Sequence, residues 1–323
     1  MARVSPVPDR PEGFHRPPLD LAGKRRRAFS EQLVKWLLAA CATFTLITTA
    51  GIAFILLYES LQFFREVPVR DFLTGSEWTA LFPADASFGV LPLVRGTLII
   101  AGISACVSIP LGLMAAIYLS EYAGERSRAI LKPVLEVLAG VPTIVYGFFA
   151  LKFITPNLIE PFFDAGVFNG LSAGIAVGIM TLPLVASLSE DALRAVPGSL
   201  REAAYGLGAT KFETSVRVVL PAAISGVISS FILAVSRAIG ETMIVAMAAG
   251  SRPAGMGAAG DWDPRQSMQT MTGFIAQAFS GDVSRESVQF YSLFGVGLLL
   301  FLMTFAMNML SHWVARRFRE EYD

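Results

Sequence analysis

Six apolar runs, separated by polar segments, divide the sequence. A transmembrane helix needs roughly 20 predominantly apolar residues, and each run is long enough or nearly so. The runs are Trp36–Tyr58, Gly96–Ser120, Val134–Leu151, Ala165–Ser189, Val218–Ala249 and Ser287–Ala315. They predict an all-α membrane protein with six transmembrane helices, and an even number of spans places both termini on one side.

Proline, glycine and charged residues interrupt several of these runs. Pro110 in the second run and Gly140 with Pro142 in the third predict bends. The fourth run is rich in small residues, which allow close helix contact in a membrane. These residues are Gly170, Ala173, Gly174, Ala176 and Gly178. Arg237 and Glu241 interrupt the fifth run.

Composition agrees with a membrane protein. The chain is 54% hydrophobic and only 16% charged, whereas soluble domains are about 25% charged.

Residues 1–30 are rich in Pro and Arg and have no apolar periodicity, so we expect a disordered basic cytoplasmic tail there. Residues 31–323 are expected to form one six-helix transmembrane domain. Met268–Phe279, between the last two runs, is moderately apolar and predicts an interfacial helix.

Lysine and arginine are distributed unevenly between the two sides of the predicted bundle. The termini and the loops after the second and fourth runs hold eighteen of them, whereas the opposite loops hold five. Cytoplasmic segments of membrane proteins carry the excess of Lys and Arg. We therefore expect both termini, and the loop after the fourth run, to be cytoplasmic.

Few residues suggest a metal, cofactor or nucleotide site. Cys41, Cys106, His15 and His312 have no partners at metal-ligand spacing. The only Gly-Lys pair is Gly23-Lys24, and Arg25 follows it, so the chain has no Walker-type phosphate cradle. We expect no cofactor, no enzymatic activity of its own and no nucleic-acid partner.

The longest polar interruption in the second half of the chain is Glu202–Pro221. Ser199 with Glu202, and Thr210 with Glu213, have the spacing of capping boxes at helix starts. Gly206 and Gly208 lie between them, where a helix end or bend needs a residue that tolerates positive φ. The loop, about 190–217, is predicted to be a helix, a glycine bend and a second helix.

This loop resembles the EAA motif of type I ATP-binding-cassette importer permeases. The residues that carry the resemblance are Glu202-Ala203-Ala204, then Gly208, then Leu220-Pro221. In that family the loop forms a coupling helix that docks on a separate ATPase subunit. The resemblance therefore implies an ATPase-coupling role for Glu202, Ala203, Ala204 and Gly208.

Three further stretches are similar to permeases of the PstC type from phosphate importers. They are Leu138–Gly147, Thr181–Pro197 with its Pro183 and Val196-Pro197, and Arg237-Ala238-Ile239-Gly240-Glu241-Thr242. The resemblance implies a multi-pass protein of the bacterial inner membrane that carries phosphate by alternating access. Its implied partners are a second permease of the PstA type, ATPase subunits of the PstB type, a phosphate-binding protein of the PstS type, and membrane lipids.

Arg237 and Glu241 are the candidate substrate-path residues, with Thr242 as a further hydroxyl donor. A charge facing lipid at the bilayer centre costs at least about 3 kcal/mol. The i, i+4 spacing places both side chains on one helical face, close enough to pair. At about 1.5 Å of rise per residue, we expect Arg237 about 25 Å beyond Pro221, toward the outer half of the bilayer. A guanidinium suits phosphate oxygens, and a neighbouring carboxylate keeps binding weak enough for release.

Other hypotheses account for part of the same pattern. The charged pair can serve helix packing alone. A type I permease for molybdate or sulfate shares most of the motifs, although the R-A-x-G-E-T stretch favours phosphate. A proton- or sodium-driven secondary transporter needs a titratable relay, for which Glu241 is the one candidate. A membrane scaffold or sensor requires no transport residues.

Overall fold

The computed structural model describes residues 21–81, 86–253, 262–281, 284 and 287–317, with side chains from residue 31 onward. Within these residues the backbone is helical apart from its connections, and an isolated antiparallel bridge joins Trp78 and Phe88. The chain divides into two units, Met1–Ile55 and Leu56–Asp323. The larger unit contains all the candidate site residues.

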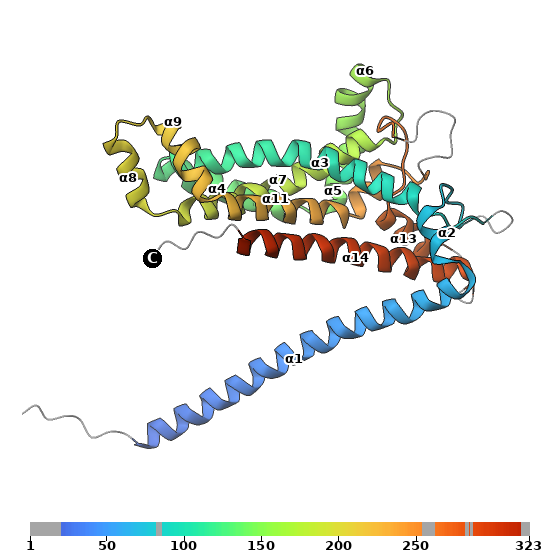
Figure 1. Cartoon of the computed structure of the whole chain (residues 1–323), viewed down its shortest axis with the longest axis horizontal. Coiled ribbons are helices and arrows are strands. Elements are labelled where there is room, and N and C mark those ends of the chain that lie inside the picture. Colours follow the sequence, from blue (N-terminus) through green and yellow to red (C-terminus); the bar gives the residue numbers. More distant parts are fainter. Residues whose placement is uncertain (1–20, 82–85, 254–261, 282–283, 285–286, 318–323) are drawn as a thin grey trace, which may run out of the picture. The chain divides into compact units, whose positions relative to one another are not determined.

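The helices follow one another as Figure 1 labels them. Three short π-helical segments, η2, η3 and η4, extend helices. In order, the elements are α1 (Leu21–Glu66), α2 (Val69–Thr74), α3 (Leu91–Ile117), η2 (Tyr118–Tyr122), α4 (Glu125–Gly140), α5 (Thr143–Phe149), η3 (Ala150–Ile159), α6 (Glu160–Phe163), α7 (Gly170–Ala195), α8 (Gly198–Gly206), α9 (Lys211–Thr214), η4 (Ser215–Val219), α10 (Leu220–Ala222), α11 (Ile224–Ile239), α12 (Met243–Ala248), α13 (Met271–Ser280) and α14 (Val288–Arg317).

Four single helices are long and apolar enough to cross a membrane. They correspond to the first, second, fourth and sixth predicted spans. The third and fifth are bent helix pairs, with angles of 89° between Glu125–Gly140 and Thr143–Phe163 and 74° between Lys211–Ala222 and Ile224–Ile239. The described residues therefore contain four spans, or six if each bent pair counts as one span, which agrees with the predicted number.

The break in the third span has a local cause. Pro142 has no N–H and its ring clashes with the preceding helical turn, while the residue before a proline is pushed to extended angles. Val141 accordingly has ψ 130°, and α4 ends at Gly140. The same Val-Pro pair ends α7, where Val196 has ψ 129° and Pro197 follows. A Val-Pro pair thus redirects the chain after both helices, and the predicted bend at Pro142 is confirmed.

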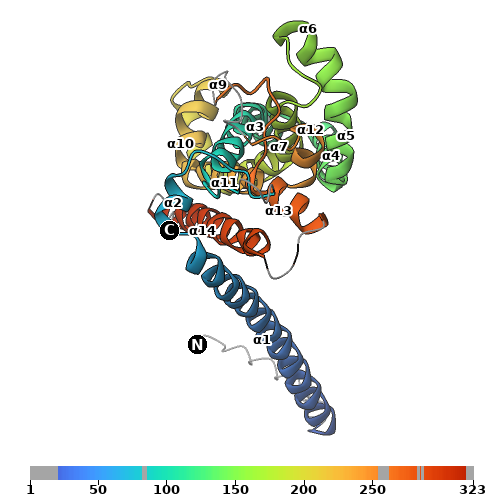
Figure 2. The ribbon, with the colours of Figure 1, turned by 90° about the vertical axis from the view of Figure 1, so that its right-hand side faces the viewer.

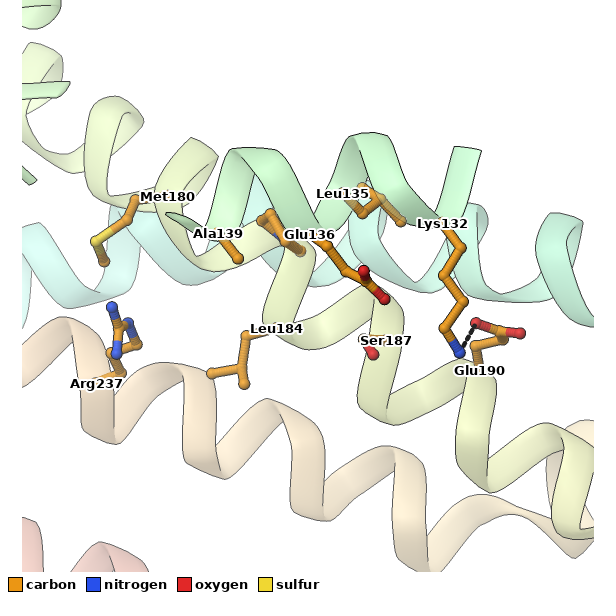
Figure 3. Close-up of a pocket in the computed structure, with 10 residues that line it drawn as sticks. Lys132, Leu135, Glu136, Ala139, Met180, Leu184, Ser187, Glu190 and Arg237 are labelled. Atoms are coloured by element: carbon orange, nitrogen blue, oxygen red, sulfur yellow. Dashed lines mark ion pairs between the residues drawn. The ribbon is translucent and has the colours of Figure 1, made fainter. Parts of the chain in front are cut away.

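The fifth predicted span is broken twice. The chain turns at Ala223, just after α10, and again at Gly240–Thr242, between α11 and α12. The stretch Val218–Ala249 is therefore not one helix. Because of the turn at Ala223, Pro221 and Arg237 do not lie on one helix axis. Arg237 lies beside Met180, near the middle of α7 (Figure 3).

Close packing of α3 against α7 forms the centre of the larger unit. A Cβ added at Gly174 would lie 2.6 Å from the Ile103 Cβ, and one added at Gly178 would lie 2.7 Å from the Val107 Cβ. The α3 side chains Ile103 and Val107 pack directly against these two glycines, and small residues permit such a close approach of two helices. The predicted role of the small residues in the fourth span is confirmed. Figure 2 shows α7 enclosed by α3, α11 and the α4–α5 pair.

An aromatic cluster closes the end of the unit that holds α2 and α13 (Figure 1). Buried Phe63, Phe72, Trp78 and Phe274 contact one another edge to face, with 4.7 Å between the ring centroids of Trp78 and Phe274. The predicted helix between the last two spans exists as α13. One face of α13 is buried against α14 and α3, so this helix belongs to the core of the unit.

The amino-terminal tail lies partly outside the described residues, at positions 1–20. Helix α1 begins at Leu21, so the basic cluster Lys24–Arg27 has helical backbone. The predicted disorder of the tail therefore stays a prediction for residues 1–20.

We expect Gly174→Ala to destabilise the unit by about 1–3 kcal/mol, because the new methyl group overlaps Ile103 and well-packed helices relax only partly. The free energy of unfolding in detergent measures this. Gly102→Ala on α3 is the matched control, since a Cβ there meets nothing within 4 Å. Equal stabilities of the two variants would contradict a tight α3–α7 contact.

Candidate functional site

A cavity of about 290 Å³ lies between α4, α7 and α11. One face of α4 and one face of α7 line it at helical spacing, and α11 contributes Arg237 (Figure 3). The lining residues are Lys132, Leu135, Glu136 and Ala139 from α4, Met180, Pro183, Leu184, Ser187 and Glu190 from α7, and Arg237. A mixed apolar and charged lining of this kind is typical of a small-ligand site.

Arg237 lies at one end of the cavity, next to Met180 and Leu184 (Figure 3). Within the described part of the chain its guanidinium makes no hydrogen bond and no ion pair. The predicted Arg237–Glu241 pair is therefore wrong. Helix α11 ends at Ile239, so the i, i+4 geometry that would bring the two side chains together does not exist.

Glu241 instead holds the start of α12. Its carboxylate accepts hydrogen bonds from the backbone N–H groups of Met243 at 3.1 Å and Ile244 at 3.3 Å. A negative charge at a helix start satisfies free N–H groups and complements the helix dipole. The Thr272 hydroxyl donates to the Glu241 carbonyl oxygen at 2.7 Å, which ties this turn to α13.

Thr242 does not line the cavity. Its hydroxyl donates to the Gly240 carbonyl oxygen at 3.4 Å, within the same turn. Of the three predicted path residues, the structure places Arg237 alone in the cavity and puts Glu241 and Thr242 in the turn that separates α11 from α12.

A cluster of charges closes the opposite end of the cavity. Glu190 of α7 is 1% exposed and forms ion pairs with Arg128, Lys132 at 3.4 Å and Arg194 at 3.8 Å. Lys132 also reaches Asp191 at 3.6 Å. Because Arg128 and Lys132 belong to α4, this cluster joins α4 to α7 at one level.

The helix that carries the EAA residues is α8, and its outer surface is open. Glu202 and Ala203 are exposed, whereas Ala204 is buried. Leu207 is 90% exposed and Phe212 is 67% exposed. Exposed apolar patches often belong to interaction surfaces, so these two side chains are candidates for one.

The predicted capping of this loop is half correct. Thr210 and Glu213 form the capping box, with the Thr210 hydroxyl accepting from the Glu213 N–H and the Glu213 carboxylate accepting from the Thr210 N–H. The predicted Ser199–Glu202 box does not form, because Pro197 precedes α8 and Ser199 falls in its first turn. Gly208 has φ +82°, as predicted, whereas Gly206 ends α8 at ordinary angles.

Arg201 fastens α8 to the rest of the bundle. Its guanidinium donates to the carbonyl oxygens of Val196 at 2.7 Å and Leu193 at 2.8 Å, which are among the last acceptors of α7. It also forms an ion pair with Glu121 of η2 at 2.8 Å. One side chain therefore links α8, the end of α7 and the segment that continues α3.

A second cavity, of about 460 Å³, lies where the segments 164–168 and 263–267 meet. Arg252 and Arg265 line it together with Asp164 and Asp263. The Arg265 side chain donates to the Asp263 carboxylate at 2.9 Å, and this hydrogen bond lowers the pKa of Asp263.

Sequence reasoning missed Glu190, Glu121 and the structural roles of Arg128, Lys132 and Arg201. These three basic residues and Arg194 counted there only toward orientation. A signal was present for Glu190, since it is an acidic residue near the end of a long apolar run with Arg194 four positions later. Its partners on α4 are 58 and 62 positions away, so no local pattern identifies them.

Comparisons with known proteins agree with this architecture. Residues 108–320 match the family described as "Binding-protein-dependent transport system inner membrane component". The chain is 32% identical over 303 residues to "Probable ABC transporter permease protein YqgH" of Bacillus subtilis, covering 92% of this chain and 94% of that protein. It is 31% identical over 312 residues to "Phosphate transport system permease protein PstC" of Mesorhizobium japonicum, with coverage of 91% and 92%.

The fold is also similar to a chain in the crystal structure of a bacterial ABC transporter involved in the import of the acidic polysaccharide alginate. The TM-score is 0.55 and the sequence identity 14%, and the alignment covers 91% of this chain and all of the other. At this identity the likeness concerns the fold alone.

A double-mutant cycle tests the separation of Arg237 from Glu241. We expect Arg237→Gln and Glu241→Gln to change the free energy of unfolding additively, within about 0.5 kcal/mol, because the two side chains do not touch. Glu241→Ala should cost about 1–3 kcal/mol by leaving the Met243 and Ile244 N–H groups without an acceptor. A coupling energy above 1 kcal/mol would show that the two side chains do interact, and would contradict their separation.

Proposed function

Because the chain belongs to the family of binding-protein-dependent transport system inner membrane components, we propose that it is the phosphate-conducting permease subunit of an ATP-driven importer. Its fold is that of the type I ABC importer permeases, and it is a multi-pass protein of the bacterial inner membrane. The relatives of the PstC type support phosphate as the substrate.

The observation that carries the substrate proposal is the Arg237 guanidinium in the cavity. It offers several N–H donors in a planar fork that fits phosphate oxygens. Within the described residues no carboxylate neutralises it, so its donors are available to a ligand. The cavity volume equals about ten times the share of one water in the liquid, which leaves room for an oxyanion with part of its hydration shell.

The surface around Glu202, Ala203 and Ala204 is the proposed docking site of an ATPase subunit. Leu207 and Phe212 supply exposed apolar contacts, and Gly208 makes the turn between α8 and α9 at a positive φ that other residues adopt at a cost of about 1–2 kcal/mol. We place this surface on the cytoplasmic side, as the Lys and Arg distribution predicts.

Helix α7 would carry motion from this surface to the cavity. Arg201 fixes α8 to the end of α7, and α7 runs from there past Glu190 to Met180, a rise of about 20 Å over 13 residues. A displacement of α8 by the ATPase would therefore move one wall of the cavity. The α4–α7 charge cluster around Glu190 would open and close on that motion.

The partners follow from this assignment. A second permease of the PstA type would complete the membrane pathway, ATPase subunits of the PstB type would hydrolyse ATP, and a phosphate-binding protein of the PstS type would deliver the substrate. This chain itself would bind no nucleotide.

Uptake of radiolabelled phosphate tests the proposal in cells without an importer of their own. We expect the chain with its partners to restore uptake, and Arg237→Gln to assemble normally but reduce uptake at least tenfold, since the path loses its cation. Glu241→Gln should retain most of the uptake. Failure of the wild type to move phosphate with a working ATPase present would favour another oxyanion such as molybdate or sulfate.

Arg201→Lys tests the coupling route, because an ammonium cannot reach Glu121, Leu193 and Val196 together. We expect ATP hydrolysis to persist while uptake falls about tenfold or more. Arg126→Lys, an exposed arginine of α4, is the control and should leave both activities unchanged. Parallel loss of assembly and hydrolysis would instead assign Arg201 to docking.

A further inference from the structure

The cavity contains a second charge that has no partner among the described residues. Glu136 of α4 lines the same cavity as Arg237, and its carboxylate lies near Ser187, with Leu184 between it and Arg237 (Figure 3). Within the described residues Glu136 makes neither a hydrogen bond nor an ion pair. One cavity therefore presents an unpaired guanidinium and an unpaired carboxylate that do not touch each other.

The other charged groups of the cavity are already paired. Glu190 is surrounded by Arg128, Lys132 and Arg194, so its oxygens are occupied, and Lys132 is shared between Glu190 and Asp191. Among the described charges facing the cavity from α4, α7 and α11, Arg237 and Glu136 alone remain available to a ligand.

We propose that Glu136 selects oxyanions that carry a proton, by accepting a hydrogen bond from the anion's hydroxyl while Arg237 donates to its charged oxygens. This inference rests on the proposed transport of phosphate through the cavity. It assigns to Glu136 a specificity role that is separate from the attraction exerted by Arg237.

The chemistry distinguishes two classes of tetrahedral anion. Phosphate and arsenate keep at least one proton near neutral pH, so each has an O–H that a carboxylate can accept. Sulfate is fully ionised and has no proton to donate, so it meets Glu136 as a like charge. Such repulsion, added to a missing hydrogen bond, is how binding sites reject a close analogue.

A thiol-protection experiment on the complete transporter in lipid nanodiscs tests this. Cys41 and Cys106 are exposed and are replaced by Ser, and Ala139→Cys places a thiol in the cavity lining. The rate at which a small thiol reagent modifies residue 139, followed by mass spectrometry of its peptide, reports anion occupancy. Phosphate, arsenate and sulfate are titrated at equal ionic strength and neutral pH.

We expect phosphate and arsenate to protect the thiol at concentrations at least tenfold lower than sulfate. Glu136→Gln should lower this ratio about tenfold or more, because a hydrogen bond to a charged group is lost and the repulsion of sulfate disappears. Glu160→Gln, which changes an exposed carboxylate of α6 outside the cavity, should leave the ratio as it is in the wild type.

The outcomes separate this inference from the proposed function. An unchanged ratio in Glu136→Gln, equal protection by sulfate in the wild type, or no protection by any anion would each overturn the role of Glu136. If the wild type nevertheless restores phosphate uptake, and Arg237→Gln abolishes it, phosphate transport stands without that selectivity. If the wild type moves no phosphate, the proposed function fails first.

Discussion

The close approach of α7 to α3 is the contact on which the rest of the bundle depends. Gly174 and Gly178 let α3 approach closely because they have no side chain of their own and Ile103 and Val107 pack directly against them. In lipid such packing replaces the hydrophobic drive that joins helices in water. With α7 fixed in this way, its opposite face is left to form the wall of the cavity with α4 and α11. One helix thus serves both as the core element and as one side of the candidate pathway.

Charges hold the bundle together at defined points along α7. Glu190 joins it to α4, and Arg201 joins its final carbonyl oxygens to α8 and η2. Breaking a buried ion pair by removing one partner costs several kcal/mol, so these links resist separation of the helices that they join.

The separation of Arg237 from Glu241 changes how the site can work. A guanidinium neutralised by its own helix would need to leave that partner before binding an anion. The turn at Gly240 removes Glu241 from reach and uses its carboxylate to start α12. Arg237 is thereby left uncompensated by any described side chain, and the carboxylate to which we assign a role in the cavity is that of Glu136, on another helix.

Local rules account for the parts that could be predicted in advance. Apolar runs identified the spans, Gly140 with Pro142 marked the break of the third span, and the Thr210–Glu213 spacing gave a true capping box, because each depends on residues within a few positions. The Arg237–Glu241 pair and the Ser199–Glu202 box were wrong because each assumed a continuous helix or a helix start that a nearby turn or proline had moved. The partners of Glu190 and Arg201 lie up to 62 and 80 positions away. Such contacts arise from how helices pack, and packing fixes which charges meet and which remain free to bind a ligand.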